Sequence, residues 1–565
     1  MGYFNTIQET IVNNFTLHEK DKANLVYFIQ FLEESRVGQI LADIINSNSN
    51  SKRGRKGYNP YHLYAMIVYG FAISSGTLRK LEELCRCDLR LIFLMRGALP
   101  TYVTISEFLN NVVVKGYKQI FICLVKAFVR KFDLDVSEVF VDGSKFEANA
   151  NKYLFVFKPN TFHARLNHSI IELVNRYFPK HFKENKKFIT SREVADVITQ
   201  LKTKIDKENY SLKTGKGVRN TPQIVKDYKL LCTQLNKCLE YEEKEEICGQ
   251  NRNSYYKTDK DATAMCLKED YYSGLGSNMH AAYNIQLIVS KGIVLDFYLG
   301  QERADFKAFI TTIDEFYKNY QSYPSIICAD SGYGSLENYE YLKNRNIQNY
   351  IKFPMRQKFV NGEIIDLYKF DESESLICLN NKVAKKITSN THPKRKGEAL
   401  YLIDNCKFCR HKQICFEKVK DKKAHQRIFK ANYKLWLYKQ QAIKNLLSPK
   451  GIEMRVNRSC QVEGVFGIIK QDLAYERFRR RSLEKVTMEM SLVLSGFLIR
   501  KLIRAKDGED IFTFWKAPHD IVDEKPKVKR RRKKAKSSRK ISINEKAKQL
   551  YKVQKRKAKR ALGIS

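Results

Sequence analysis

The sequence predicts an α/β protein in which helices flank a mixed sheet, and three observations support this fold class. Residues 1–131 space their apolar side chains three and four apart, as helices do. Residues 132–505 contain short apolar strands that alternate with helical stretches. Two long polar insertions interrupt that alternation. With 565 residues the chain exceeds the usual length of one domain, so we expect several domains or one domain with large insertions.

Residues 1–131 are expected to form a helical domain. The stretch beginning "NPYHLYAMIVYGFAISSGTLRKLEELCRC" opens with an Asn-Pro helix start and shows no strand alternation. The basic segment "SKRGRKG" precedes it. Such a unit can contact DNA or simply pack on the next domain, and we favour DNA contact.

The predicted core, residues 132–505, begins with a short strand in "SEVFVDG" that ends at Asp142. A hairpin of two strands follows, then a helix, an apolar strand that ends at Asp330, a second helix and a last strand. Because Asp-Gly is a common end of a strand, Asp142 alone does not indicate a site. The elements are expected at residues 137–143, 280–290, 292–300, 304–320, 325–334, 335–345 and 348–353.

Neighbouring strands of a mixed sheet can bring Asp142 and Asp330 side by side, at the edge where open α/β sheets bind ligands. Close carboxylates repel each other unless a cation lies between them, and Mg²⁺ prefers such oxygen ligands. Two ions about 3.5–4 Å apart can assist phosphoryl transfer. Glu463 is the candidate third carboxylate, and Lys470, seven residues later, lies only about 20° away on a helix. An ordinary solvated helix face would have the same spacing.

The composition is strongly basic, with 102 Lys and Arg against 61 Asp and Glu and a formal charge of +41. This charge predicts a polyanionic partner, usually nucleic acid, with an anionic membrane surface as the alternative. No stretch has the apolar length of a membrane span, and the start of the chain lacks a signal-peptide layout. Thirteen cysteines, an odd number, favour a reducing compartment, so we expect a cytoplasmic protein.

Two basic segments are candidate DNA contacts. In the predicted tail, residues 506–565, positions 525–560 hold nineteen Lys and Arg against one acid, Glu545. Such a block has too few apolar residues for a core and is either a DNA-contacting arm or a solvated tail. The second segment, "YERFRRR", contributes Arg477, Arg479, Arg480 and Arg481.

Three stretches, "FVDGSKFEANANKY", "CADSGYGSLENYEYL" and "RSCQVEGVFGIIK", resemble the catalytic blocks of DDE transposases of bacterial insertion sequences, specifically the insertion-sequence eleven-eighty-two family. The likeness covers most of residues 53–505. It implies an RNase H-like fold in which Asp142, Asp330 and Glu463 hold two Mg²⁺ ions, with Mn²⁺ as a substitute.

The resemblance also implies phosphate-contacting residues. Many such transposases carry a tyrosine, arginine, glutamate and lysine signature, to which Glu463 and Lys470 correspond. The arginine of that signature would fall at Ser459, and Arg458 lies one residue earlier, so its role is left open. Lys145, with Glu147, Asn149 and Asn151, follows the family's first block, and their period of two predicts one strand face near the site. A solvent-facing edge would explain that pattern equally well.

Two insertions are predicted within the core. Residues 160–250 are expected to form charged helices, as a hairpin or coiled arm that either contacts a second copy or stands alone at the surface. Residues 356–450 contain a Cys-x-x-Cys pair and a third cysteine, Cys406, Cys409 and Cys415, as a candidate zinc site. A closed site needs a fourth ligand, for which the candidates are Cys378, His411 and His425.

The sequence therefore predicts a Mg²⁺-dependent transposase that cleaves the ends of its element and joins the 3′ ends to target DNA. The expected partners are double-stranded DNA, as terminal inverted repeats and as target, and a second copy of the chain on paired ends. We expect it at the nucleoid. A nuclease of the same fold that cuts without joining, and a catalytically decayed DNA-binding protein, are the alternatives.

Overall fold

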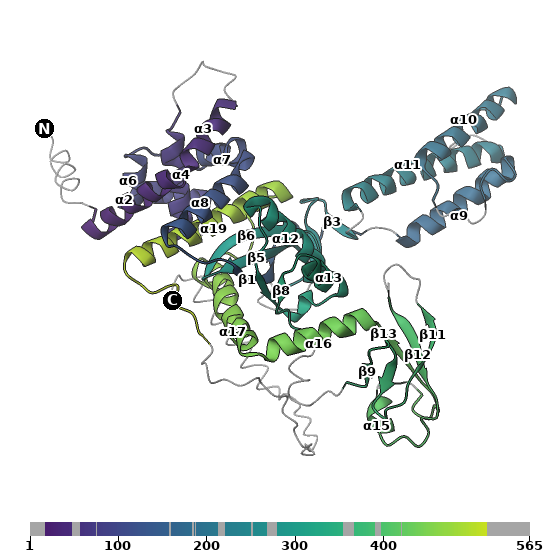
Figure 1. Cartoon of the computed structure of the whole chain (residues 1–565). Coiled ribbons are helices and arrows are strands. Elements are labelled where there is room, and N and C mark those ends of the chain that lie inside the picture. The colour runs from purple at the N-terminus through teal and green to yellow at the C-terminus, as the bar shows by residue number, and fades with distance from the viewer. Residues whose placement is uncertain are drawn as a thin grey trace, which may run out of the picture.

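The computed structural model describes residues 17–516, apart from 48–56, 75, 158–159, 184–185, 187, 213–220, 250–251, 268–278, 354–365, 390–396, 418 and 420. Figure 1 shows a central sheet with helices packed around it, a group of helices from the N-terminal part at one side, and two projecting parts. The predicted mixed α/β architecture with many helices is confirmed. Most of the predicted basic tail, residues 517–565, lies outside the described residues.

The N-terminal part is helical, and the predicted Asn-Pro start of its central helix, α4, is confirmed. The Asn59 side chain accepts hydrogen bonds from the backbone amides of Tyr61 and His62, and Pro60 occupies the first turn, where its missing N–H costs nothing. The helices are α2 (Glu19–Glu34), α3 (Val37–Ser47), α4 (Pro60–Ile73), α5 (Leu78–Cys87), α6 (Leu89–Met95), α7 (Tyr102–Asn111) and α8 (Tyr117–Lys131), with the 3₁₀ turn η1 (Val113–Lys115).

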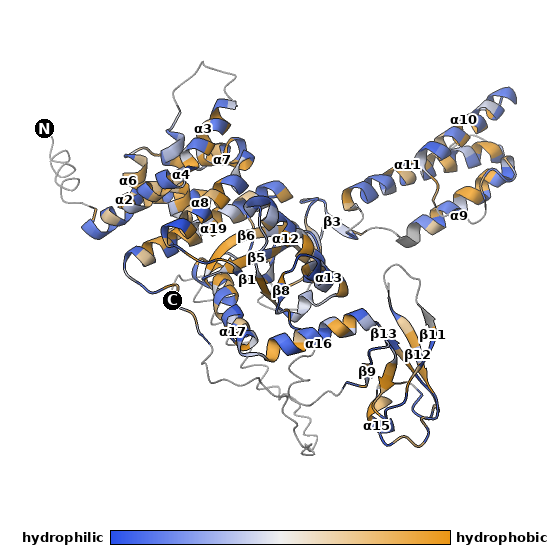
Figure 2. Cartoon of the chain, viewed as in Figure 1, coloured by the Kyte–Doolittle hydropathy of each residue, from blue (hydrophilic) through white to orange (hydrophobic). Residues whose placement is uncertain are grey.

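The long C-terminal helix α19 (Leu483–Lys506) joins these helices to the sheet. It is buried around most of its circumference from Val486 to Leu502, because it packs between α4, α8 and β6. One continuous cluster of buried side chains runs from α2 through the sheet to α19. The hydrophobic colouring of Figure 2 accordingly concentrates around the sheet and its flanking helices.

The central sheet has the order β4–β5–β1–β7–β8, and β6 also pairs with β5. Strand β1 is antiparallel to β5 but parallel to β7, and β7 is parallel to β8. Helices α12 (Asp305–Tyr320) and α13 (Leu336–Asn344) connect the strands in the predicted order. The strands are β1 (Glu138–Glu147), β4 (Thr263–Cys266), β5 (Met279–Ser290), β6 (Ile293–Gly300), β7 (Ile326–Ala329) and β8 (Gln348–Asn349).

Three strand ends differ from the prediction. Strand β7 ends at Ala329, one residue before Asp330, because the 3₁₀ turn η2 (Ser331–Tyr333) begins there. Strand β1 does not end at Asp142 but continues to Glu147, because β5 pairs with it from Phe140 to Glu147 and so supplies backbone partners beyond the turn-forming Asp-Gly pair. The last strand, β8, is shorter than the predicted 348–353, although the amides of Tyr350 and Lys352 still donate to carbonyls of β7.

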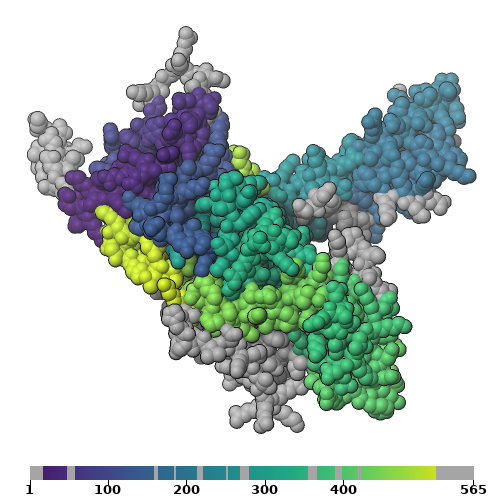
Figure 3. Space-filling model, in the orientation of Figure 1, coloured from purple at the N-terminus to yellow at the C-terminus, as the bar shows by residue number. Residues whose placement is uncertain are grey.

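The first insertion forms a helical arm with its own apolar core. Its described residues form three helices, and α9 packs on both α10 and α11, so the arm is not a simple hairpin. Figure 3 shows this arm standing away from the body. Its helices are α9 (Asn160–Tyr177), α10 (Ser191–Lys207) and α11 (Gln223–Cys248), and the paired strands β2 (Phe155–Phe157) and β3 (Ser254–Tyr256) form its base.

The second insertion is a small β-rich unit, also with its own core. It leads into α16 (Tyr433–Leu447), which returns the chain to the sheet (Figure 1). Its elements are β9 (Tyr368–Phe370), β10 (Leu376–Cys378), β11 (Lys385–Ser389), β12 (Ala399–Ile403), α15 (Lys412–Cys415) and β13 (Arg427–Ala431).

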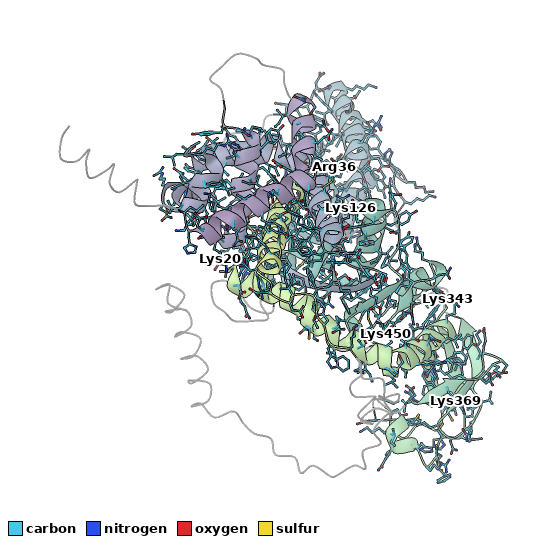
Figure 4. All side chains as sticks on the ribbon, turned by 60° about the vertical axis from the view of Figure 1, so that its left-hand side comes forward. Lys20, Arg36, Lys126, Lys343, Lys369 and Lys450 are labelled. Carbon is cyan, nitrogen blue, oxygen red and sulfur yellow. The ribbon has the colours of Figure 1, made fainter. Side chains whose placement is uncertain are left out.

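Basic side chains project from many elements. Figure 4 labels six of them, which come from α2, the α2–α3 junction, α8, α13, β9 and α17. None of the helices described is long and apolar enough to cross a membrane.

Candidate functional site

The sheet register places Asp142 and Asp330 next to each other. Val141 of β1 pairs with Ala329 of β7 in a parallel ladder; Asp142 is the next residue of β1, and Asp330 is the first residue after β7. Because paired positions of neighbouring strands point to the same side, the two carboxylates lie on one face at the end of β7. The Asp330 side chain is 47% exposed and that of Asp142 is 21% exposed, so the site is open on the Asp330 side.

A helix crosses this face of the sheet and carries the third carboxylate. Helix α17 (Pro449–Arg458) begins at the cap Ser448, whose side chain accepts from the amide of Gly451, and it packs on β7. The regular helix predicted through residues 462–469 is interrupted. Two π-helical turns, η4 (Ser459–Glu463) and η5 (Ile468–Asp472), enclose the single α-turn α18 (Gly464–Gly467). Such turns occur frequently at functional sites.

The first π-helical turn aligns Arg458 with Glu463. On an α-helix, residues five apart point about 140° away from each other, whereas a π-helical turn brings residues i and i+5 together. The guanidinium of Arg458 donates to the Glu463 Oε1 at 3.0 Å and to the Asp142 Oδ2 at 2.8 Å. Comparison with the transposase signature left the role of Arg458 open. The π-helical turn places its guanidinium between Asp142 and Glu463, two of the three predicted catalytic carboxylates.

Burial and charge oppose each other at this site. Burial raises the pKa of Asp142 above its usual value; the positive Arg458 works against that rise, and the neighbouring Asp330 adds to it. Burial alone would lower the pKa of Arg458, but the nearby carboxylates, Asp142 first, raise it above its usual value. The cluster therefore keeps a buried positive charge beside its most buried carboxylate.

Two lysines extend the site. Lys470 Nζ donates to the Ser144 Oγ at 2.7 Å and lies 4.5 Å from the centre of the Phe146 ring. Ser144 is two residues beyond Asp142, so Lys470 lies over the same face of β1. Lys352, which sequence reasoning missed, lies 3.9 Å from Asp330. The feature of the sequence that could have identified Lys352 is the strand "QNYIKF", which contains it. That strand was predicted, but no role was assigned to its lysine.

Lys145 occupies the opposite face of β1. Side chains alternate along a strand, so Lys145 and Glu147 share one face, but it is not the face of Asp142. Asn149 and Asn151, which were predicted to continue this face, lie beyond the end of β1. The Lys145 Nζ donates to the carbonyl of Cys266 in β4 at 3.4 Å. A role for Lys145 in DNA binding remains a prediction.

The arginine segment is extended and lies along the end of β1. The amide of Phe478 donates to the Glu147 carbonyl at 2.9 Å, and the Glu147 amide donates to the Glu476 carbonyl at 3.3 Å. Arg477 lies 3.8 Å from the Glu147 carboxylate, and the Arg481 Nε donates to the Asn149 carbonyl at 2.9 Å. The arginines therefore do not share a helical turn, because this backbone pairs with β1. DNA contacts by Arg477, Arg479, Arg480 and Arg481 remain a prediction.

The cysteines of the second insertion converge. A small cavity of about 20 Å³ is lined by Cys378, Cys406, Cys409, Cys415 and His411, whereas His425 does not line it. Within the described ranges, however, no group of three or more His, Cys, Asp or Glu side chains is arranged to hold a metal ion. Zinc binding therefore remains a prediction.

The same finding applies to the three carboxylates, and Arg458 gives a physical reason for it. Its guanidinium occupies the space between Asp142 and Glu463 that a cation would need. The donor set itself fits Mg²⁺ or Mn²⁺, because it consists of carboxylate oxygens and leaves room for water and substrate on the exposed side. Two of these carboxylates already share one positive charge.

Comparison with known proteins supports a DDE transposase domain. Residues 377–503 match a family model described as "Transposase DDE domain". The matched segment contains Glu463, Lys470 and the arginine segment but neither Asp142 nor Asp330. No curated protein matches the chain.

A solved structure of a piggyBac transposase synaptic complex with hairpin DNA is similar at 10% identity, with 87% of this chain and 77% of that chain covered. Its TM-score of 0.28 is too low to place any residue of this chain.

Proposed function

We propose that this protein is a DDE transposase with an RNase H-like core, in which Asp142, Asp330 and Glu463 form the catalytic site. The observation that carries the proposal is the convergence of these three carboxylates. They come from β1, from the end of β7 and from the helix with Glu463, which lies inside the segment that matches the transposase family model. The strand order, with β1 between an antiparallel and a parallel neighbour, supports the core assignment.

The three carboxylates would hold two divalent ions, Mg²⁺ or Mn²⁺, which supply charge stabilisation for in-line displacement at phosphorus. The backbone of Asp142 lies within β1, and that of Asp330 directly follows β7, so the sheet positions both residues. Glu463 is 57% exposed and sits on the helix nearest the open side, where it completes the ligand set. The DNA substrate approaches the site from the side of Asp330 and Glu463, since these two are the most exposed of the three carboxylates.

Lys470 is proposed to hold the phosphate beside the scissile bond. It lies over the same face of β1 as Asp142, and its ammonium donates a hydrogen bond to the Ser144 hydroxyl. A phosphate oxygen can replace this hydroxyl as the acceptor. The basic body and tail bind the rest of the DNA, as terminal inverted repeats and then as target. We further propose an insertion-sequence origin, action at the nucleoid, and a dimer on paired ends.

The proposal is tested with the variants Asp142→Asn, Asp330→Asn and Glu463→Gln, and with Glu372→Gln as the control on an exposed loop of the second insertion. Each of the first three is expected to lose cleavage of an end-containing DNA by at least about a thousandfold while end binding is retained, because each removes a ligand of the divalent ions that stabilise the transition state. Full Mg²⁺-dependent cleavage by any of the three removes that residue from the site. Strand joining by the wild type separates a transposase from a nuclease.

A further inference from the structure

Arg458 lies between the catalytic carboxylates in a way that the signature did not predict. Its side chain is only 6% exposed, and its two terminal nitrogens reach Asp142 and Glu463 separately. We infer that Arg458 is an internal counter-ion, which occupies the cation position of the site in the free protein and must leave it before divalent ions are bound. This inference rests on the proposed function and specifies how its site is regulated.

The charges at the site require such a group. Asp142, Asp330 and Glu463 bring three negative charges to one face of the sheet, and Asp142 is largely buried. Arg458 supplies a positive charge within 3.0 Å of two of them, and Lys352 lies 3.9 Å from the third. A guanidinium suits this position because its planar fork reaches two carboxylates at once and stays charged at every physiological pH. Arg458 and Lys352 thus offset two of the three negative charges.

The same contacts occupy two oxygens that an ion shared by Asp142 and Glu463 would use. Mg²⁺ binds carboxylate oxygens at about 2.0–2.1 Å. The Asp142 Oδ2 and the Glu463 Oε1 instead accept hydrogen bonds from Arg458 at 2.8 and 3.0 Å, so an ion that uses both of these oxygens must displace the guanidinium. An ion shared by these carboxylates would occupy the volume of the guanidinium and repel its charge. Arg458 and the ion therefore compete for one place.

The π-helical turn η4 offers a way for Arg458 to leave. The contact with Glu463 exists because η4 brings residues five apart together. If this turn relaxes to α-helical spacing, the two side chains move about 140° apart around the helix. Helix α17 is anchored upstream of η4, where the Cys328 thiol of β7 donates to the Met454 carbonyl. The turn itself is held by the buried Gln461 side chain, which accepts from the Gly292 amide, so this contact must adjust when Arg458 leaves.

The released guanidinium needs a new acceptor, and the phosphate of bound DNA is the one the function supplies, because arginine and phosphate pair through two hydrogen bonds. Metal loading and DNA binding are then coupled through one residue. Because such coupling is reciprocal, DNA should raise the affinity for the ion by the same factor as the ion raises the affinity for DNA.

The test is Mn²⁺ binding to the full-length protein, followed by the electron paramagnetic resonance signal of free Mn²⁺, with and without an end-containing DNA. Without DNA, Arg458→Ala and Arg458→Gln are expected to bind Mn²⁺ at least about tenfold tighter than the wild type, and Arg458→Lys to lie between. With DNA the wild type gains affinity and Arg458→Ala gains much less. Thermal melting in EDTA and in Mn²⁺ reports folding, and Mn²⁺ should raise the midpoint of Arg458→Ala more than that of the wild type.

Arg455→Ala is the matched control. It removes a positive charge from the same helix, and Arg455 Nε donates to the Gly451 carbonyl. If Arg455→Ala gains the same Mn²⁺ affinity as Arg458→Ala, the effect comes from the loss of any positive charge and the inference is overturned. Unchanged or weaker Mn²⁺ binding by all three Arg458 variants would overturn it as well. Asp330→Asn separates the two proposals. If wild-type Mn²⁺ binding does not depend on Asp330, the proposed function itself fails; if it does and the Arg458 variants bind no tighter, only the counter-ion role fails.

Discussion

Gly496 lies where α19 touches the backbone of α4, and its replacement tests how the N-terminal helices join the core. A Cβ at this position would lie 2.6 Å from the carbonyl carbon of Phe71, 2.7 Å from its oxygen and 2.8 Å from the amide nitrogen of Ala72. These are backbone atoms of a helix that is buried on nearly every side, so no side-chain rotation can relieve the contact. Gly496→Ala therefore forces the two helices apart.

The expected loss of stability follows from two opposing terms. Alanine in a helix interior is favoured over glycine by about 1 kcal/mol. Overpacking a buried site costs about 1–3 kcal/mol and often more when backbone must shift, so the clash outweighs the gain in helix propensity. We expect a net destabilisation of about 1–2 kcal/mol, seen as a lower midpoint in urea or on heating.

Gly467→Ala is the matched control, because Gly467 is also helical and a Cβ there meets nothing within 4 Å. It should leave stability unchanged or raise it by up to about 1 kcal/mol. A Gly496→Ala protein as stable as Gly467→Ala would show that α19 and α4 do not lie in this close contact, and with it that the N-terminal helices do not share the core as described.

Three further predictions concern function. Lys470→Ala should slow single-turnover cleavage at saturating protein more than it weakens end binding, because its charge matters most as charge builds up at the phosphate; a normal rate once bound would make Lys470 an ordinary surface lysine. Deletion of residues 525–565 should weaken binding to all DNA sequences alike and flatten its salt dependence, by about 0.9 in the log–log slope for each lost phosphate contact, whereas an unchanged slope would indicate a solvated tail. If the cysteines that line the small cavity of the second insertion bind zinc, the protein purified without chelator should contain one zinc per chain, and Cys409→Ser should remove it. Metal content measured by mass spectrometry checks this.

The pattern of the sequence by itself determined most of the fold. The order β1, β5, β6, α12, β7, α13, β8 follows from local apolar spacing, whereas the short strand β4, which also lies in the sheet, was not predicted. The start of α4 follows from Asn59 and Pro60, whose effects are confined to a single turn. The same spacing placed Asp330 at the end of β7. It also placed Asp142 in β1, at the level where β1 lies beside the end of β7. Local patterns suffice for these features because each depends on neighbours within a few residues.

Only the tertiary structure decided how the site is arranged. The length of β1 depends on pairing with β5, more than a hundred residues away, and this pairing puts Lys145 on the face opposite Asp142. The extended path of the arginine segment likewise depends on the end of β1.

The position of Arg458 shows the limit most clearly. Counted as an α-helix, the sequence places it away from Glu463, and the π-helical turn η4 reverses that result. A π-helical turn has no strong local signature, and this one is accompanied by contacts of Arg458 with a carboxylate 316 residues earlier in the chain. Such long-range electrostatic contacts favour a local geometry that residue spacing alone does not encode.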